Sequence, residues 1–107
     1  MHMIINSKKY EIPEIDFNFI CETENKGVSL FSMEDKPLGV LRAFLATCMD
    51  TDAETAGKEI EEHLIKGGNL EVALESMTEA LEKSNFFQKL VEREEQAEEK
   101  KGKSQKK

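Results

Sequence analysis

The first hydrophobic positions of the chain fall in two short runs with a polar link between them. The runs are residues 3–5 and residues 10–12, and four polar residues, Asn6 to Lys9, separate them. Polar turn formers between two apolar runs are typical of a β-hairpin. Pro13 ends the second strand, because proline has no backbone N–H for the ladder. An isolated hairpin is marginal in water, so we expect helices to cover one of its faces.

The next segment has two interpretations. Residues 15–19 alternate apolar and polar side chains as a strand does. The same stretch can also begin a helix, capped by Asp16 or Asn18 and ended by Gly27, which is free to take the left-handed conformation. We favour a short helix over about residues 18–25, entered from an extended segment. On the helical interpretation one face carries Phe17, Ile20 and Cys21.

The most apolar stretch of the chain follows Pro37, a residue that suits the first turn of a helix. Between Leu38 and Met49 only Arg42 is charged. A helix that is apolar on nearly all sides must be covered on most of them. We therefore expect this helix to lie at the centre of the core.

Two amphipathic helices complete the pattern. The first covers about residues 52–66 and is ended by Gly67 and Gly68, and the second begins after the capping residue Asn69 and covers about residues 70–99. Apolar residues at helical spacing form their inner faces: Ala53, Ala56, Ile60 and Leu64 in the first, and Leu70, Ala73, Leu74, Met77, Ala80 and Leu81 in the second.

Together these segments predict a mainly α fold: an N-terminal β-hairpin, about four helices of which the last is long, and a disordered basic tail. A chain of 107 residues is expected to form one domain. We place this domain at residues 1–91, because no apolar stripe continues beyond Val91. Residues 92–107 are expected to form a charged helical extension that leads into a flexible, lysine-rich tail.

Charge narrows the range of partners. Acidic residues outnumber basic ones by 22 to 15, which gives a formal net charge of −7. Five lysines lie within residues 100–107, so residues 1–99 carry 22 acidic and 10 basic side chains, a net charge of −12. Such a body repels phosphate backbones, which argues against nucleic acid as a partner. No run approaches the roughly 20 apolar residues of a membrane span, so we expect no membrane partner.

The sequence offers little that indicates catalysis. Cys21 and Cys48 lie among apolar residues that disfavour a reactive thiolate, and we expect both to be reduced and buried in a cytoplasmic protein. Glu59 and His63 lie one helical turn apart and could form half of a metal site, but no second pair of ligands accompanies them. A surface histidine beside carboxylates is the favoured interpretation. We expect no enzyme activity, no cofactor and no metal.

One apolar cluster suggests a binding surface. It consists of Phe86, Phe87, Leu90 and Val91. Adjacent helical residues point about 100° apart, so both rings cannot face one narrow seam. The cluster can widen the inner stripe to pack against the hairpin or Phe31, or it can form an apolar patch that binds a partner or a second copy of the chain. On the second interpretation, these four residues are the candidate partner-binding site.

The order of the predicted elements resembles that of a known family. The stretches that carry the resemblance are Ile4–Tyr10, Asp16–Glu24, Gly27–Leu30, Leu38–Cys48 and Gly67–Gly68. They are similar to the tail assembly chaperones of long-tailed bacteriophages and related prophages, in which a short β-hairpin precedes a helix with an acidic end, a glycine and a small apolar turn. The likeness covers about residues 3–91 and rests on pattern and order rather than on a catalytic signature.

The resemblance implies a function in the cytoplasm of a bacterial host. Members of that family act as adaptors that coat the tape-measure protein, a very long, helical and partly hydrophobic chain. They keep it soluble until tail-tube subunits polymerise around it, so the tape-measure protein is the expected partner and the tail-tube protein a second one. The family supplies no binding residues that transfer position by position. The candidate residues Phe86, Phe87, Leu90 and Val91 therefore come from the apolar pattern alone.

Other binding functions remain open. The alternative is a different acidic helical adaptor, such as an antitoxin-like or anti-repressor protein that masks a basic partner. A helix-turn-helix DNA reader over residues 52–82 is disfavoured, because the second helix would present four glutamates to the groove. Apolar surface left over on the last helix would also allow the chain to form a homo-oligomer.

Deleting residues 100–107 is expected to leave thermal stability unchanged, because a lysine-rich tail without apolar residues has nothing to bury. The melting temperatures of the full-length and shortened proteins, followed by circular dichroism, test this. A marked drop in the shortened protein would show that the tail docks on the folded body.

Overall fold

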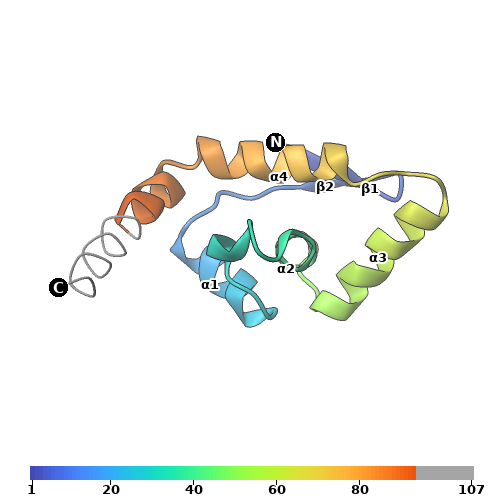
Figure 1. The fold of residues 1–107 in the computed structure, drawn as a ribbon, viewed down its shortest axis with the longest axis horizontal. Coiled ribbons are helices and arrows are strands. Elements are labelled where there is room, and N and C mark those ends of the chain that lie inside the picture. Colours follow the sequence, from blue (N-terminus) through green and yellow to red (C-terminus); the bar gives the residue numbers. More distant parts are fainter. Residues whose placement is uncertain (94–107) are drawn as a thin grey trace.

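The computed structural model describes residues 1–93 and confirms a mainly α fold with an N-terminal hairpin (Figure 1). The lysine-rich tail and most of the predicted charged extension lie outside the described residues. In chain order the elements are β1 (His2–Ile5), β2 (Lys8–Glu11), α1 (Phe17–Asn25), the 3-10 helix η1 (Leu30–Ser32), α2 (Pro37–Met49), α3 (Ala53–Ile65) and α4 (Glu71–Lys83), followed by a helical segment over residues 85–93.

The hairpin turn is tighter than the polar pattern predicts. Only Asn6 and Ser7 form the turn, both with left-handed backbone angles (φ 55° and 62°). Such angles match the twist of a two-residue hairpin turn, and asparagine tolerates them better than most residues. Ile5 pairs with Lys8 across the turn, so Lys8 and Lys9 belong to the second strand. The predicted four-residue link was wrong because these lysines are polar yet stand on an exposed strand.

The predicted central helix is at the centre. α2 contacts α1, α3, α4, η1 and β2, and Figure 1 shows it almost end-on between α1 and α3. Its buried apolar residues are Val40, Leu41, Ala43, Phe44, Leu45 and Ala46. Pro37 begins the helix, as expected, and Asp50 ends it in the left-handed conformation (φ 57°). The other elements therefore form a shell around one apolar helix.

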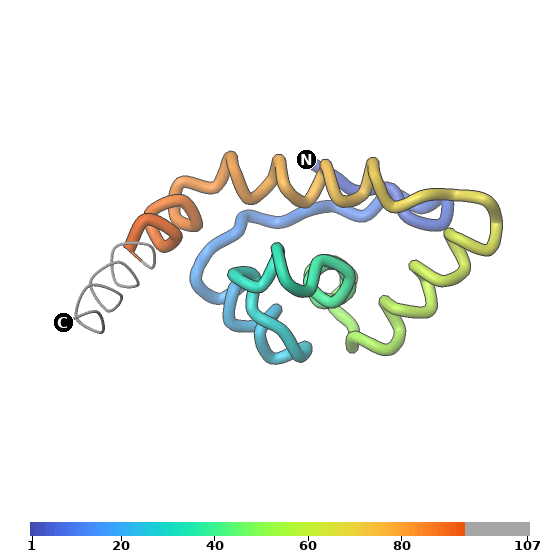
Figure 2. Tube along the Cα trace, viewed as in Figure 1, coloured from blue at the N-terminus to red at the C-terminus, as the bar shows by residue number. Residues whose placement is uncertain are grey.

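The hairpin and α4 form the layer on one side of α2. Met3 and Ile5 are fully buried whereas Ile4 between them is half-exposed, the alternation of a strand with one covered face. α4 lies along β1 (Figure 2) and buries Ala73 and Met77, two residues of its predicted inner stripe. The hairpin is thus stabilised by helix packing rather than by its own two strands.

α1 confirms the helical interpretation of the segment after Pro13, and it begins at Phe17, one residue before the predicted start. Asp16 is the cap, since its Oδ1 accepts the Phe19 N–H at 2.8 Å; Asn18 lies inside the helix. α1 is joined to α2 by two buried threonine hydroxyls, Thr23 and Thr47, whose Oγ1 atoms lie 2.9 Å apart.

α3 lies within the range predicted to be a helix, residues 52–66, but one residue of its predicted inner face is exposed. Asp52 caps it and Ala56 is fully buried against the core. Leu64, which the apolar spacing places on the inner face, is instead exposed. At this end α3 contacts the hairpin turn through the polar residues Glu59 and His63, so no apolar surface is available to cover Leu64.

The single long helix predicted over residues 70–99 is broken at Ser84. This residue is extended (ψ 109°), and a new helical segment over residues 85–93 continues in another direction (Figure 2). The Ser84 hydroxyl donates to the Ile15 carbonyl oxygen (2.9 Å) and accepts the Phe87 N–H (3.1 Å). Ser84 therefore caps the new segment and fastens it to the chain before α1.

Candidate functional site

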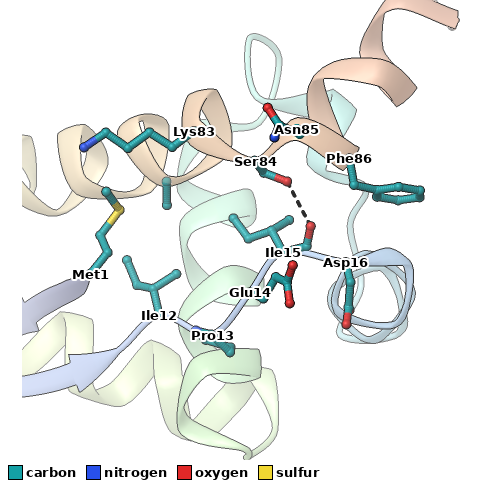
Figure 3. Close-up of a pocket in the computed structure, with 11 residues that line it drawn as sticks. Met1, Ile12, Pro13, Glu14, Ile15, Asp16, Lys83, Ser84, Asn85 and Phe86 are labelled. Carbon is teal, nitrogen blue, oxygen red and sulfur yellow. Dashed lines mark hydrogen bonds between the residues drawn. The ribbon is translucent and has the colours of Figure 1, made fainter.

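A groove of about 390 Å³ lies where the helix breaks at Ser84 (Figure 3). The extended residues 12–16 form one wall, and the end of α4 with the start of the next helical segment forms the other. Three buried apolar residues, Ile12, Ile15 and Ala80, line it. The Ser84–Ile15 hydrogen bond spans the two walls and fixes their separation.

An exposed aromatic pair stands beside this groove. Phe86, a lining residue, is 42% exposed and Phe17 is 60% exposed. Their ring centroids are 6.3 Å apart with the planes perpendicular, an edge-to-face contact. The sequence pattern grouped Phe17 with the inner residues of its helix. It lies outside because it is the first residue of α1, where the helix has only just left the extended segment.

The four candidate partner-binding residues do not act as one surface. Phe87 is only 6% exposed and stacks on Phe31 with ring centroids 5.6 Å apart. Leu90 and Val91 are partly buried and pack against the core. Of the four residues, Phe86 alone is exposed. One interpretation of the sequence was that this cluster packs against the hairpin or Phe31, and the contact between Phe87 and Phe31 is present.

Negative charge dominates the edge of the groove. Glu14 and Asp16 are exposed on the extended wall. Lys83 lies on the opposite wall, but its ammonium donates to Glu79 Oε1 at 2.8 Å. This hydrogen bond, together with the positive charge of Lys83, lowers the pKa of the Glu79 carboxyl. Lys83 therefore pairs with a carboxylate of its own helix, while Glu14 and Asp16 add negative charge on the extended wall.

The Glu59–His63 pair has a structural role that the sequence did not indicate. Nδ1 of His63 accepts the Asn6 N–H at 2.8 Å, and Nε2 lies 2.9 Å from the Asn69 carbonyl oxygen. A carbonyl can only accept, so the ring is assigned the tautomer with its proton on Nε2. Both nitrogens are engaged, which leaves no lone pair for a metal. Gly68 makes room for the ring, since a Cβ there would lie 2.5 Å from Nε2.

Glu59 completes this junction between α3 and the hairpin. Its carboxylate accepts the Tyr10 hydroxyl at 2.9 Å and pairs with Lys8 Nζ at 3.4 Å. Burial, then the hydrogen bond to Glu59, raises the pKa of Tyr10 to about 12. The Tyr10 hydrogen bond is also the main reason that the pKa of Glu59 lies below its usual range. The favoured interpretation as a simple surface histidine beside carboxylates therefore missed a long-range junction.

The remaining candidate chemistry is sparse. Burial raises the pKa of the Cys48 thiol to about 12, which disfavours a nucleophilic thiolate there. Within residues 1–93, no group of three or more histidine, cysteine or acidic residues is placed to hold a metal ion. In the same part of the chain, no helix combines the length and apolarity that crossing a membrane requires.

Comparison of the chain with protein-family models, with curated proteins and with solved structures finds no match.

Substitution of each of the two adjacent phenylalanines should show which ring stabilises the fold. Phe87→Ser is expected to lower the free energy of unfolding by roughly 3 kcal/mol, because a buried aromatic ring is lost. Phe86→Ser should cost about 1 kcal/mol or less, since that residue is already 42% exposed. Urea unfolding followed by circular dichroism measures both. Equal losses would contradict the assignment of Phe86 to the surface.

The Glu59 junction predicts a specific acid sensitivity. Because the pKa of Glu59 is lowered in the folded protein, the unfolded chain binds a proton more readily. Its contribution is present above about pH 4.3, the usual glutamate value, and is lost as the pH falls through the lowered pKa. Wild-type stability should therefore fall more steeply between about pH 5 and pH 3 than that of Glu59→Gln.

Urea unfolding at a series of pH values measures this difference. Glu61→Gln is the matched control, since Glu61 is exposed on the same helix and its carboxylate has no hydrogen bond or ion pair within the described residues. It should retain the wild-type dependence on pH. Parallel curves for the wild type and Glu59→Gln would refute the role of the junction.

Proposed function

We propose that this protein is a tail assembly chaperone of a long-tailed phage or prophage, which binds the tape-measure protein and keeps it in solution before tail-tube polymerisation. The observation that carries the proposal is the exposed Phe17–Phe86 pair beside an apolar groove on an otherwise acidic body. The resemblance in element order over about residues 3–91 supports the same function.

An apolar groove with an aromatic edge suits a helical client. Amphipathic helices are bound through a few apolar side chains that enter a groove while the rest of the helix stays outside. Aromatic residues contribute strongly to such interfaces because they bury a large area at a small entropic cost. Phe17 and Phe86 are therefore the residues expected to contact the client first, with Ile12 and Ile15 beneath.

The net negative charge of residues 1–99 suits the proposed role of keeping the client in solution. A client covered by many copies of a chain whose residues 1–99 carry a net charge of −12 gains a strongly charged coat. Like charges on the coated chains repel each other and oppose aggregation. Each contact can be weak, since many copies bound along one long client together mask it, while single copies can still be displaced by tail-tube subunits.

A second function is favoured by a different surface. Four exposed glutamates follow the outer face of α4: Glu71, Glu75, Glu79 and Glu82. A basic protein could bind this face, as in the antitoxin-like or anti-repressor adaptor. The two functions differ in their response to salt, because exposed charge pairs are screened at high ionic strength and apolar contacts are not.

Co-expression with the largest tape-measure-like open reading frame next to this gene tests the proposal. A soluble complex that survives a pull-down at high salt is expected, since apolar contacts do not weaken with ionic strength. A complex lost at high salt would favour the acidic adaptor. No complex, with the large protein soluble on its own, would refute the chaperone function.

The same experiment with single variants locates the binding surface. Phe86→Ser should reduce the amount of complex. Leu38→Ser is the matched control, because Leu38 is 63% exposed at the start of α2 and does not line the groove. An equal loss with both variants would argue against a client site beside Phe86.

A further inference from the structure

The groove beside Phe86 combines an apolar lining with an acidic edge, and these two features define the chemistry of what it would bind. We infer that it takes a large apolar side chain from a helix that carries a lysine or arginine about one turn away. The client segment is then a basic amphipathic helix. This inference rests on the proposed function and specifies which parts of a long client the protein would bind.

The size of the groove sets what can enter. One turn of helix is about 10–12 Å across and 5.4 Å long with its side chains, a cylinder of roughly 420–610 Å³, which exceeds the groove volume of about 390 Å³. The groove therefore admits side chains while the helix axis remains outside. Among its lining residues, the buried Ile12, Ile15 and Ala80 offer apolar contact. An aliphatic or aromatic anchor fits this lining.

The edge of the groove selects positive charge. Glu14 and Asp16 stand on the extended wall, and within the described residues the Glu14 carboxylate has neither an ion pair nor a hydrogen bond. Asp16 uses one carboxylate oxygen, Oδ1, to accept the Phe19 N–H at the start of α1. Lys83, the cation on the opposite wall, is held by Glu79 at 2.8 Å. A basic side chain of the client would thus meet two carboxylates, while the one side-chain cation that lines the groove, Lys83, already pairs with Glu79.

The aromatic pair adds to this preference. Phe17 meets Phe86 edge to face, and both rings are partly open to solvent. The face of an aromatic ring attracts a lysine or arginine cation at close range. Phe17 follows Asp16 directly in the chain, so the aromatic pair lies next to the acidic edge of the groove. Apolar anchoring and charge recognition therefore occur within one small area.

Two occupants other than a client fit less well. A second copy of the chain would bring its own acidic body, with a net charge of −12 over residues 1–99, against an acidic edge. The lysine-rich end of the same chain carries the right charge but no anchor, since Ala97 is the only apolar residue in residues 94–107 apart from a glycine. A basic segment with a large apolar residue satisfies both requirements.

Synthetic helical peptides test the inference directly. Three fluorescent peptides of about 20 residues are used, because much shorter helices are marginal in water. The first carries leucines on one face with lysines one turn away, the second has glutamates in place of the lysines, and the third has serines in place of the leucines. Fluorescence anisotropy with the full-length protein should show binding of the first, binding at least about tenfold weaker of the second, and no saturable binding of the third.

Variants of the protein show whether the groove is the site. Phe86→Ser should abolish most of the binding of the leucine–lysine peptide. Glu14→Lys should narrow or invert the preference between the lysine and glutamate peptides, while Glu24→Lys, an equal change of charge on the exposed end of α1, should leave the preference as it is. Circular dichroism verifies that each variant keeps its helical content.

The outcomes distinguish the inference from the proposed function. Equal binding of the lysine and glutamate peptides, or a preference that Glu14→Lys does not alter, would overturn the inference. If the tape-measure protein binds but no peptide does, the chaperone function stands and the groove chemistry is wrong. If the leucine–lysine peptide binds at the groove and the tape-measure protein does not, the recognition chemistry stands and the client is a different protein.

Discussion

The structure depends on covering one helix that is apolar nearly all round. α2 has a single charged side chain, Arg42, and most of its other side chains are fully buried. A surface of that kind gains about 25 cal/mol for every Å² removed from water, so contact with α2 stabilises the elements around it, while α4 also packs along β1. The two-stranded hairpin, unstable alone, and the short helix η1 persist because they form part of this cover.

The groove lies where the chain that packs around α2 changes direction, at Ser84. A continuous helix after residue 70 would carry Phe87 away from the core. The break at Ser84 instead lets the chain turn, so that Phe87 stacks on Phe31 and closes the core. The same turn moves Phe86 outward and leaves space between α4 and residues 12–16. An exposed aromatic residue and an apolar groove are thus consequences of burying its neighbour.

The sequence predicts the parts of this fold that local chemistry controls. Pro37 begins α2, and Gly67, with its φ of 95°, lies directly after α3, as composition and spacing indicate. Contacts between distant residues could not be foreseen. Ser84 breaks a helix because its hydroxyl meets the carbonyl of Ile15, 69 positions away, and nothing in the pattern near residue 84 records that partner. Of the candidate site, the sequence found Phe86, the one residue of four that the structure leaves open.

The long-range contacts that the sequence could not predict lie in two parts of the molecule, one that joins elements of the fold and one that shapes the groove. The junction of Glu59 and His63 fastens the hairpin to α3, while the Ser84 hydroxyl holds the two walls of the groove at a fixed spacing on another part of the molecule. A groove whose walls are already fixed loses little conformational entropy when a side chain enters it. In the proposed chaperone function, where the client must later be displaced, such a site would have an advantage: a small buried area gives a weak single contact, and an acidic edge hastens the association of a basic client without adding much to its lifetime.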